Sequence, residues 1–450
     1  MQTKTLAVAA VAAFALTLPP AVLAQDNHID TVRADAPALA PYGRYATGVE
    51  TLGLVHPRQL DLVHAKPGEP LPVYDRPLTV EVWYPAKAAA PQPGDGRYRV
   101  MTRDGKTEAT LVGKARRDAV PDASGGPYPL IIISHGYPGN RYLLADLGEN
   151  LASKGYVVVS IDHTDSTYGD QAAFASTLLN RPLDQLFVLD QMARLGKSDP
   201  NGKLTGLIDA DHTGLIGYSM GGYGVVNTIG GGFSAASVAA TGPISVPGGA
   251  LTVRQAGNGA YAATIDKRVK AAMAFAPWGW NYGFWDAAGL AGIRTPVFFV
   301  AGSVDDVAGY KPGVRNLFES SVNAQRYLLT FENANHNAGA PIPAPLETWM
   351  PSGPQQAVTA GHYADPVWDS VRMNNIAEHF ATAFLGKYLK NDTAMDAYLA
   401  LTENAADGKW SARPDGSFNA DHTYWHGFAR RSAVGLRLEQ RPPAAAIAHD

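Results

Sequence analysis

Residues 213–222 read TGLIGYSMGG, a run of apolar residues that leads into a glycine-rich turn around Ser219. Residues 213–218 have the composition of a buried strand, and residues 223–229 have the spacing of a helix. A tight turn between a strand and a helix needs small residues two positions before and after the serine, because the two backbones approach closely there. The stretch therefore predicts a nucleophilic Ser219 lifted clear of a sheet.

The bare spacing of Gly217, Ser219 and Gly221 is a weak signal, because a structural turn with an ordinary serine would match it too. Its position between a strand and a helix makes the nucleophile the favoured interpretation. The helix that follows also directs its free N–H groups toward the serine.

Apolar runs of strand length alternate with segments of helical spacing on both sides of this turn. Strands are expected at residues 78–84, 130–134, 157–162, 213–218, 271–275, 297–301 and 327–331. Helices are expected at residues 141–153, 183–195, 223–229, 314–322 and 373–389. Several strands are continuous apolar runs, typical of strands buried on both faces. The alternation predicts the α/β class, with a mostly parallel central sheet flanked by helices.

A serine nucleophile needs a base and a group that orients the base, and in this architecture they follow along the chain as Asp or Glu, then His. Asp305 follows strand 297–301, and His336 follows strand 327–331. The competing carboxylate is Asp306, and we favour Asp305 because adjacent side chains point in different directions. Ser219, Asp305 and His336 are thus the predicted catalytic residues, and activity is expected to rise with pH as the histidine titrates.

An oxyanion hole would use the N–H after the nucleophile and another N–H from a loop after an earlier strand. Met220 supplies the first. The second is expected from Tyr137, because strand 130–134 ends in the sequence HGYPG at residues 135–139. His135 could be a second base, although a histidine in such a turn more often braces the loop.

Residues 278–285 read WGWNYGFW and follow strand 271–275, at the sheet edge where ligands bind in such folds. Trp278, Trp280 and Trp285 are candidates for substrate binding. Packing of these rings onto the body of the protein is an equally good interpretation. Residues 162–165 (DHTD) could contact substrate or a cation, but no ligand set converges on them, so we expect no metal and no cofactor.

Composition narrows the functional classes. The formal net charge of −4, with no run of basic residues, argues against nucleic-acid partners. The absence of cysteine excludes disulfides, a thiol nucleophile and thiolate metal sites. Lys4, the apolar run at 6–18 and the small residues at 22–24 predict a cleaved signal peptide at 1–24 and a periplasmic or secreted protein. No later stretch approaches the roughly 20 apolar residues of a membrane span, so no stable membrane insertion is expected.

The expected organisation is a signal peptide at 1–24, a poorly ordered leader at 25–45, a catalytic domain at 46–395 and a C-terminal extension at 396–450 packed on that domain. Residues 91–126 are rich in Pro, Gly and charge and predict a surface excursion. Residues 230–259 predict an insertion after the nucleophile helix, where a mobile rim or lid over a pocket would lie.

The chain resembles the α/β-hydrolase superfamily from about residue 77 to residue 389. The motifs that carry the resemblance are at residues 82–85 (VWYP), 135–136 (HG), 151–157 (LASKGYV), 162–163 (DH), 181–184 (RPLD) and 217–222 (GYSMGG). Within the superfamily it is similar to predicted dienelactone hydrolases and to bacterial relatives of platelet-activating factor acetylhydrolase. The elbow and the HGY loop also resemble those of cutinase-like polyesterases.

The resemblance implies a cofactor-free serine esterase or lipase with Ser219, Asp305 and His336 as its triad, acting on a small-molecule or lipid-like ester. Dienelactone hydrolases proper use a cysteine nucleophile, which this chain lacks. A lipid acetylhydrolase and a polyesterase remain open within the same chemistry, and a binding protein that keeps only the fold is the alternative from another class. A peptidase is disfavoured, because nothing resembles an added propeller domain. The sequence leaves acyl preference and oligomeric state open.

Overall fold

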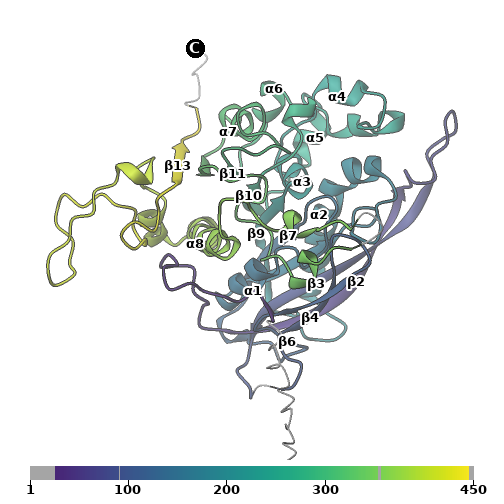
Figure 1. Cartoon of the computed structure of the whole chain (residues 1–450). Coiled ribbons are helices and arrows are strands. Elements are labelled where there is room, and N and C mark those ends of the chain that lie inside the picture. Colours follow the sequence, from purple (N-terminus) through teal and green to yellow (C-terminus); the bar gives the residue numbers. More distant parts are fainter. Residues whose placement is uncertain (1–25, 91, 353–355, 445–450) are drawn as a thin grey trace, which may run out of the picture.

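The computed structural model describes residues 26–90, 92–352 and 356–444, and the predicted signal peptide lies outside them. The described residues form a ten-stranded sheet covered by helices, with a smaller three-stranded sheet at one side (Figure 1). Within these ranges, no helix is both long enough and apolar enough to cross a membrane. The predicted α/β architecture is confirmed.

The large sheet places its central strands in parallel. Its spatial order is β13 (Leu436–Arg441), β12 (Arg326–Phe331), β11 (Val297–Gly302), β10 (Val269–Phe275), β9 (Ile208–Tyr218), β7 (Tyr128–Ser134), β8 (Val157–Asp162), β3 (Val73–Ala86), β2 (Ala46–Leu60) and β6 (Arg116–Arg117). The six strands from β12 to β8 are parallel, whereas β13 and β3 run antiparallel to their neighbours. From β7 the chain moves outward to β8 and then returns to β9 on the other side of β7. Ligands bind at such a switch point, beyond the carboxyl ends of the strands.

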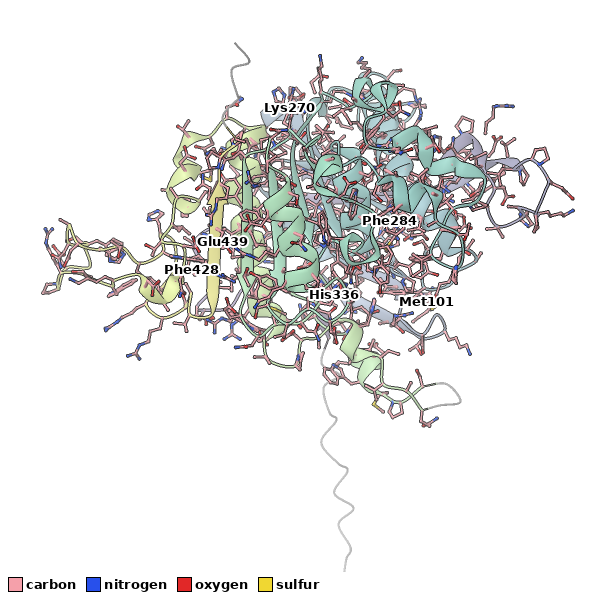
Figure 2. The ribbon with its side chains drawn as sticks, turned by 90° about the horizontal axis from the view of Figure 1, so that it is seen from above. Met101, Lys270, Phe284, His336, Phe428 and Glu439 are labelled. Atoms are coloured by element: carbon pink, nitrogen blue, oxygen red, sulfur yellow. The ribbon has the colours of Figure 1, made fainter. Side chains whose placement is uncertain are left out.

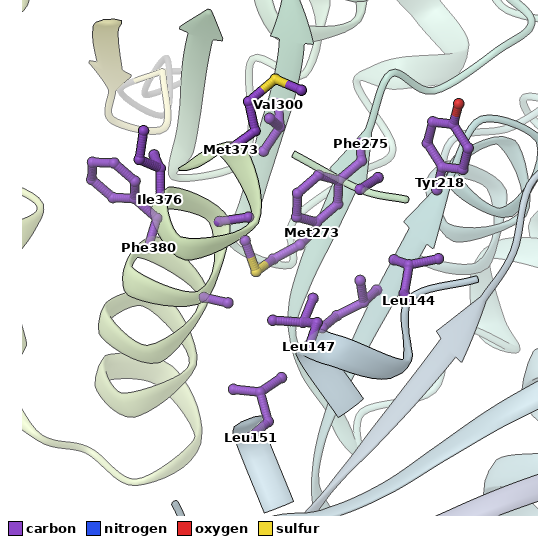
Figure 3. Packing of buried hydrophobic residues seen from close by; sticks show 14 of the residues in the cluster. Leu144, Leu147, Leu151, Tyr218, Met273, Phe275, Val300, Met373, Ile376 and Phe380 are labelled. Atoms are coloured by element: carbon purple, nitrogen blue, oxygen red, sulfur yellow. The ribbon is translucent and has the colours of Figure 1, made fainter. Parts of the chain in front are cut away.

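Helices cover both faces of this sheet. On one face lie α1 (Ala145–Ser153) and α8 (Ser370–Leu389), and on the other lie α2 (Phe174–Lys197), α3 (Met220–Thr228) and α7 (Arg315–Ser320). Residues of β10 alternate between the two cores: Met273 packs with α1 and α8, and Ala274 packs with α3. Figure 3 shows Leu147 of α1 and Phe380 of α8 on either side of Met273. Burial on both faces explains why the central strands are continuous apolar runs.

Helix α2 begins nine residues before the predicted start and continues through Pro182. Proline cannot donate to the carbonyl four residues earlier, which here belongs to Leu178. The Tyr223 hydroxyl on α3 donates to that carbonyl over 2.9 Å. Tyr223 therefore satisfies the acceptor that Pro182 leaves free, and it joins α2 to the helix that follows Ser219.

The longest strand of the sheet, β2, was not predicted from the sequence. It contains Gly48, Gly53 and Pro57, which are turn signals rather than strand signals. In the structure a Cβ on Gly48 would lie 2.4 Å from the ring of Tyr84 on β3. Glycine is needed there because the tyrosine ring packs against the strand at this position. The residue that argues against a strand in the sequence is therefore required by the packing of that strand.

The small sheet contradicts two expectations. Its order is β1 (Asn27–His28), β5 (Glu108–Val112) and β4 (Arg97–Met101), so the expected leader and the expected surface excursion pair with each other. Residues 26–45 also pack on the body: Ile29 and Ala40 are buried, and the Leu39 N–H donates to His379 of α8. Apolar burial and backbone hydrogen bonds order a segment whose composition predicts little structure.

The insertion at 230–259 packs on the body of the protein. It holds α4 (Ala235–Ala239) and the 3₁₀ segment η2 (Pro247–Arg254), and α5 (Gly259–Ala263) follows. Phe233 and Leu251 are buried, and the Arg254 guanidinium donates to Asn227 at the end of α3. The cavity at Ser219 has no lining residue from 230–259, and residues of the insertion instead line a separate cavity together with Ala288 and Arg294.

The C-terminal segment contributes a strand to the main sheet. β13 pairs antiparallel with β12, and Trp425 and Leu438 are buried in the core beneath α8. Figure 1 shows this yellow segment beside α8. The remaining short helices are η1 (Ala123–Gly125), η3 (Trp280–Tyr282), α6 (Ala287–Leu290), η4 (Tyr310–Val314), η5 (Leu346–Trp349), η6 (Ala360–His362), η7 (Thr393–Tyr398) and η8 (Ala405–Asp407).

Candidate active site

Ser219 lies in the sharp turn between β9 and α3. Its φ is 52° and its ψ is −112°, a conformation that costs a non-glycine residue of the order of 1–3 kcal/mol. The backbone can turn this tightly because Gly221 lies against β7, where a Cβ would come 1.9 Å from the Ser134 carbonyl oxygen. The Ser219 N–H donates to Phe275 of β10 over 2.9 Å. The predicted elbow geometry is present, with glycine where contact forbids a side chain.

Three predicted residues meet at the carboxyl edge of the sheet. His336 Nε2 lies 3.0 Å from Ser219 Oγ, and His336 Nδ1 lies 3.1 and 3.0 Å from the two carboxylate oxygens of Asp305. Figure 2 shows His336 between the part of the molecule that carries Phe284 and the part that carries Glu439 of β13. With its proton on Nδ1, the imidazole would donate to Asp305 and present a free lone pair to the serine hydroxyl.

Asp305 and Asp306 occupy different environments. Asp305 is buried, and its Oδ1 accepts the N–H groups of Val307 and Ala308, each over 2.9 Å. Burial opposes its ionisation, but the hydrogen bond with His336 and those backbone donors outweigh burial and lower the pKa of Asp305. Asp306 is exposed, and its own N–H donates to Asn335. Of the two carboxylates, Asp305 is the one that contacts His336.

The loop that carries His336 is fixed at both neighbouring residues. The Asn335 N–H donates to Asp365 over 2.6 Å, and Asn337 accepts the Tyr218 hydroxyl over 2.8 Å. Asn337 also donates to the carbonyls of Gly361 and Ala364. The imidazole is therefore held from the segment between η5 and α8 as well as from β9.

The two predicted oxyanion donors flank Ser219. Met220 is the first residue of α3, and the loop after β7 passes so close that a Cβ on Gly136 would lie 3.4 Å from Ser219 Cβ. In the part of the chain that the structure describes, the N–H groups of Tyr137 and Met220 have no protein acceptor. Both N–H groups are thus free to donate hydrogen bonds to an anionic oxygen.

A cavity of about 350 Å³ opens beside the serine. Its walls include Tyr137, Ser219, Asp306, His336, His362 and Pro366. Sequence reasoning missed the wall formed by residues 361–366, because a single 3₁₀ turn in a long connection carries no motif. Burial lowers the pKa of His362 to about 3, and its Nε2 lies 2.9 Å from the Tyr168 hydroxyl. His362 is therefore a neutral polar wall at working pH.

The aromatic loop does not line this cavity. Trp285 is buried and donates its indole N–H to Gly231 over 3.1 Å. Trp278 stacks on Tyr282 at 4.4 Å between ring centroids, and Trp280 packs on the same core. The structure favours packing of the three tryptophans onto the body of the protein over a place in the wall of this cavity. The backbone N–H of Trp278 donates to the Ser219 carbonyl over 3.2 Å.

Residues 162–165 belong to a buried polar network behind the site. Asp162 pairs with Arg141, whereas His163 and Asp165 belong to the set around Asp184 and Arg76. Burial lowers the pKa of His163 to about 3, so this histidine is neutral. Asp162, His163 and Asp165 are thus all engaged by hydrogen bonds within the network.

Comparison with known proteins gives consistent relatives. A family model described as PET hydrolase-like matches residues 117–247. Cutinases est1 and est2 of Thermobifida alba are each 36% identical over 99 residues, which cover 22% of this chain and 29% of each relative. A cutinase of Thermobifida fusca strain YX is 34% identical over 99 residues, 22% of this chain and 27% of the relative. The match thus spans less than a third of the length of these relatives.

A ferulic acid esterase from Streptomyces cinnamoneus shares the fold over a greater length. It aligns with a TM-score of 0.52 and 22% identity, covering 81% of this chain and 96% of that chain. Likeness at this identity concerns the fold alone. The sheet order, the elbow at Ser219 and this structural match show an α/β-hydrolase fold, as the sequence motifs indicated.

Proposed function

We propose that this chain is a serine hydrolase that cleaves carboxylic esters through Ser219, His336 and Asp305. The observation that carries the proposal is the continuous set of contacts from Asp305 through His336 to Ser219 Oγ, at 3.0 Å in each step, at the wall of a cavity. The strained backbone at Ser219 supports it, because such strain is retained mainly at functional sites.

The chemistry follows from these positions. His336 Nε2 accepts the Ser219 proton as Oγ attacks the ester carbonyl carbon, and the N–H groups of Tyr137 and Met220 stabilise the resulting oxyanion. The bond to the alcohol then breaks as His336 returns the proton to the leaving oxygen. A water molecule, deprotonated by the same imidazole, then attacks the acyl carbon. The bond to Ser219 Oγ breaks as His336 returns the proton to that oxygen, and the acid is released. Asp305 stabilises the imidazolium in both halves of the reaction.

Similarity and the size of the site support a proposal for the substrate class. Similarity to the PET hydrolase-like family and to cutinases supports extended or polymeric esters as substrates. A cavity of about 350 Å³ holds one acyl or small aromatic group, so the rest of a longer substrate would lie outside it. Small-molecule and lipid-like esters fit the same description.

The location of the protein relative to the cell is the second part of the proposal. We propose that residues 1–24 direct export and are removed, which leaves a mature chain that starts at Gln25 in the periplasm or outside the cell. N-terminal sequencing of the exported protein tests this directly, and an intact Met1 in the mature protein would contradict it.

Covalent labelling tests the proposed nucleophile. The mature chain is treated with a fluorophosphonate, and the modified peptide is identified by mass spectrometry. The proposal predicts one adduct, on Ser219, that is lost in Ser219→Ala and greatly slowed in His336→Ala. A folded protein that takes up no probe would favour a binding protein on the hydrolase fold, and an adduct on another serine would move the site elsewhere.

A further inference from the structure

The loop that would supply the second oxyanion donor rests on a buried guanidinium. Arg181 lies on α2 and is 1% exposed. Its Nη1 donates to the carbonyl of His135, and its Nη2 donates to the carbonyl of Gly136 over 2.9 Å and to the hydroxyl of Ser166. Two consecutive carbonyls of the loop after β7 are therefore held by one cationic side chain.

These carbonyls belong to the peptide units beside the proposed oxyanion hole. The Gly136 carbonyl and the Tyr137 N–H are opposite ends of one planar, conjugated peptide unit. A charged donor on the carbonyl oxygen draws electron density from the nitrogen, which strengthens the N–H as a donor. We infer that Arg181 is a positioning residue of the oxyanion hole, which fixes the Tyr137 N–H and increases its strength. The inference rests on the proposed function.

The charge of Arg181 has no direct counterion. Over the described ranges, Arg181 forms no ion pair, and its acceptors are carbonyl and hydroxyl oxygens. Arg76, the other guanidinium buried in this network, pairs with both Asp184 and Asp165. Asp184 lies one turn beyond Arg181 on α2, but its oxygens are engaged by Arg76 and His163. The positive charge of Arg181 is thus directed at the loop, where a negative charge would develop on the substrate.

Such burial is costly without a compensating role. The Nε of Arg181 is buried and has no acceptor among the described residues. A buried charged group with an unsatisfied N–H is unfavourable for folding. Transition-state stabilisation would explain its retention, since a preorganised charge in a buried site acts with little screening.

The test compares Arg181→Lys with Arg76→Lys in the mature full chain. Both variants exchange one buried guanidinium of the same network for an ammonium, but only Arg181 contacts the carbonyls at 135 and 136. Active sites are first counted with a fluorophosphonate, so that kcat refers to folded enzyme. Arg181→Lys is expected to lower kcat for p-nitrophenyl butyrate about ten- to a hundredfold, with KM nearly unchanged. This loss in kcat is no greater than the loss caused by removal of one oxyanion donor. Arg76→Lys should keep the kcat of wild type.

A second readout separates this role from a structural one. A trifluoromethyl ketone forms a tetrahedral oxyanion on the serine, so its affinity should fall in Arg181→Lys by the same factor as kcat/KM. If Arg181→Lys does not fold, Ser166→Ala removes one partner of the same Nη2 and should weaken the ketone to a smaller degree. Equal kcat values per titrated site in wild type and Arg181→Lys, or equal losses in Arg181→Lys and Arg76→Lys, would overturn the inference. Inactive wild type would instead contradict the proposed function.

Discussion

The Tyr218 hydroxyl donates a 2.8 Å hydrogen bond to Asn337, which joins the residue before Ser219 to the residue after His336. Both side chains are buried. The bond therefore couples the two backbone segments that must hold the serine and the imidazole 3.0 Å apart.

Removal of this hydroxyl should affect both stability and rate. Tyr218→Phe leaves a buried amide oxygen of Asn337 without its donor, which costs about 1–3 kcal/mol. The His336 loop loses one of its attachments, and kcat is expected to fall up to about tenfold. Tyr84→Phe is the matched control, because its hydroxyl donates to the carbonyl of Ala119, in the loop that follows β6 at the edge of the sheet. Tyr84→Phe should lose stability without loss of kcat, and equal kcat in the two variants would contradict the coupling.

The strain at Ser219 predicts a trade between activity and stability. Ser219→Ala and Ser219→Gly both remove the hydroxyl, but only glycine relieves the positive φ of 52°. After allowance for the greater freedom of glycine in the unfolded chain, Ser219→Gly should be about 1 kcal/mol more stable than Ser219→Ala. Urea unfolding of the two variants measures this difference in stability. A less stable glycine variant would show that the turn is not strained.

Acid should destabilise the protein through buried histidines. Burial and the nearby Lys154 lower the pKa of His379 to about 3, whereas a histidine in the unfolded chain titrates near about 6.5. Below that value the unfolded chain binds a proton that the folded chain does not, so stability is complete above about pH 6.5 and falls as the pH drops toward about 3. His163 and His362 have pKa values of about 3 and act in the same direction.

A variant isolates the contribution of one histidine. His379→Gln removes the titrating group and should lose less stability than wild type between pH 7 and pH 4, by an amount on the order of 2–3 kcal/mol. At pH 8 the variant should be the less stable protein, since His379 accepts the Leu39 N–H. Denaturant midpoints measured over this pH range provide the test, and parallel curves for the two proteins would exclude His379 as a source of acid sensitivity.

The C-terminal segment is expected to be required for folding. Truncation after residue 395 removes β13, leaves β12 as an exposed edge and uncovers the core beneath α8. The truncated chain should aggregate or lose cooperative unfolding in thermal denaturation. Truncation after residue 444 is the control, because β13 ends at Arg441. A truncation at 395 that unfolds cooperatively with wild-type Tm would show that the segment is dispensable.

Local patterns explain which parts of the fold were predictable. The strands from β7 to β12 are apolar runs whose character depends on burial on both faces, so the sequence identifies them without knowledge of their partners. Ser219, Asp305 and His336 follow three of those strands, and their order along the chain is enough to propose that they meet. The structure brings all three into contact.

The parts that could not be predicted depend on contacts between distant residues. β2 is hidden by Gly48, which is required by the ring of Tyr84 rather than by a turn. β1 becomes a strand only because β5 lies beside it, and the cavity wall at Gly361 and His362 arises from a connection without periodic pattern. The role of the aromatic loop was equally unpredictable, because tryptophan suits both a ligand pocket and a packed core. Only the structure distinguishes the two at Trp285.

The most direct measurement is the turnover of p-nitrophenyl acetate and butyrate by residues 25–450, compared with the same chain carrying Ser219→Ala. The account predicts measurable hydrolysis by wild type and a loss of several orders of magnitude in a variant that remains folded by circular dichroism. Equal rates in the two proteins, or no hydrolysis by either, would contradict the assignment of Ser219 as the nucleophile of an esterase.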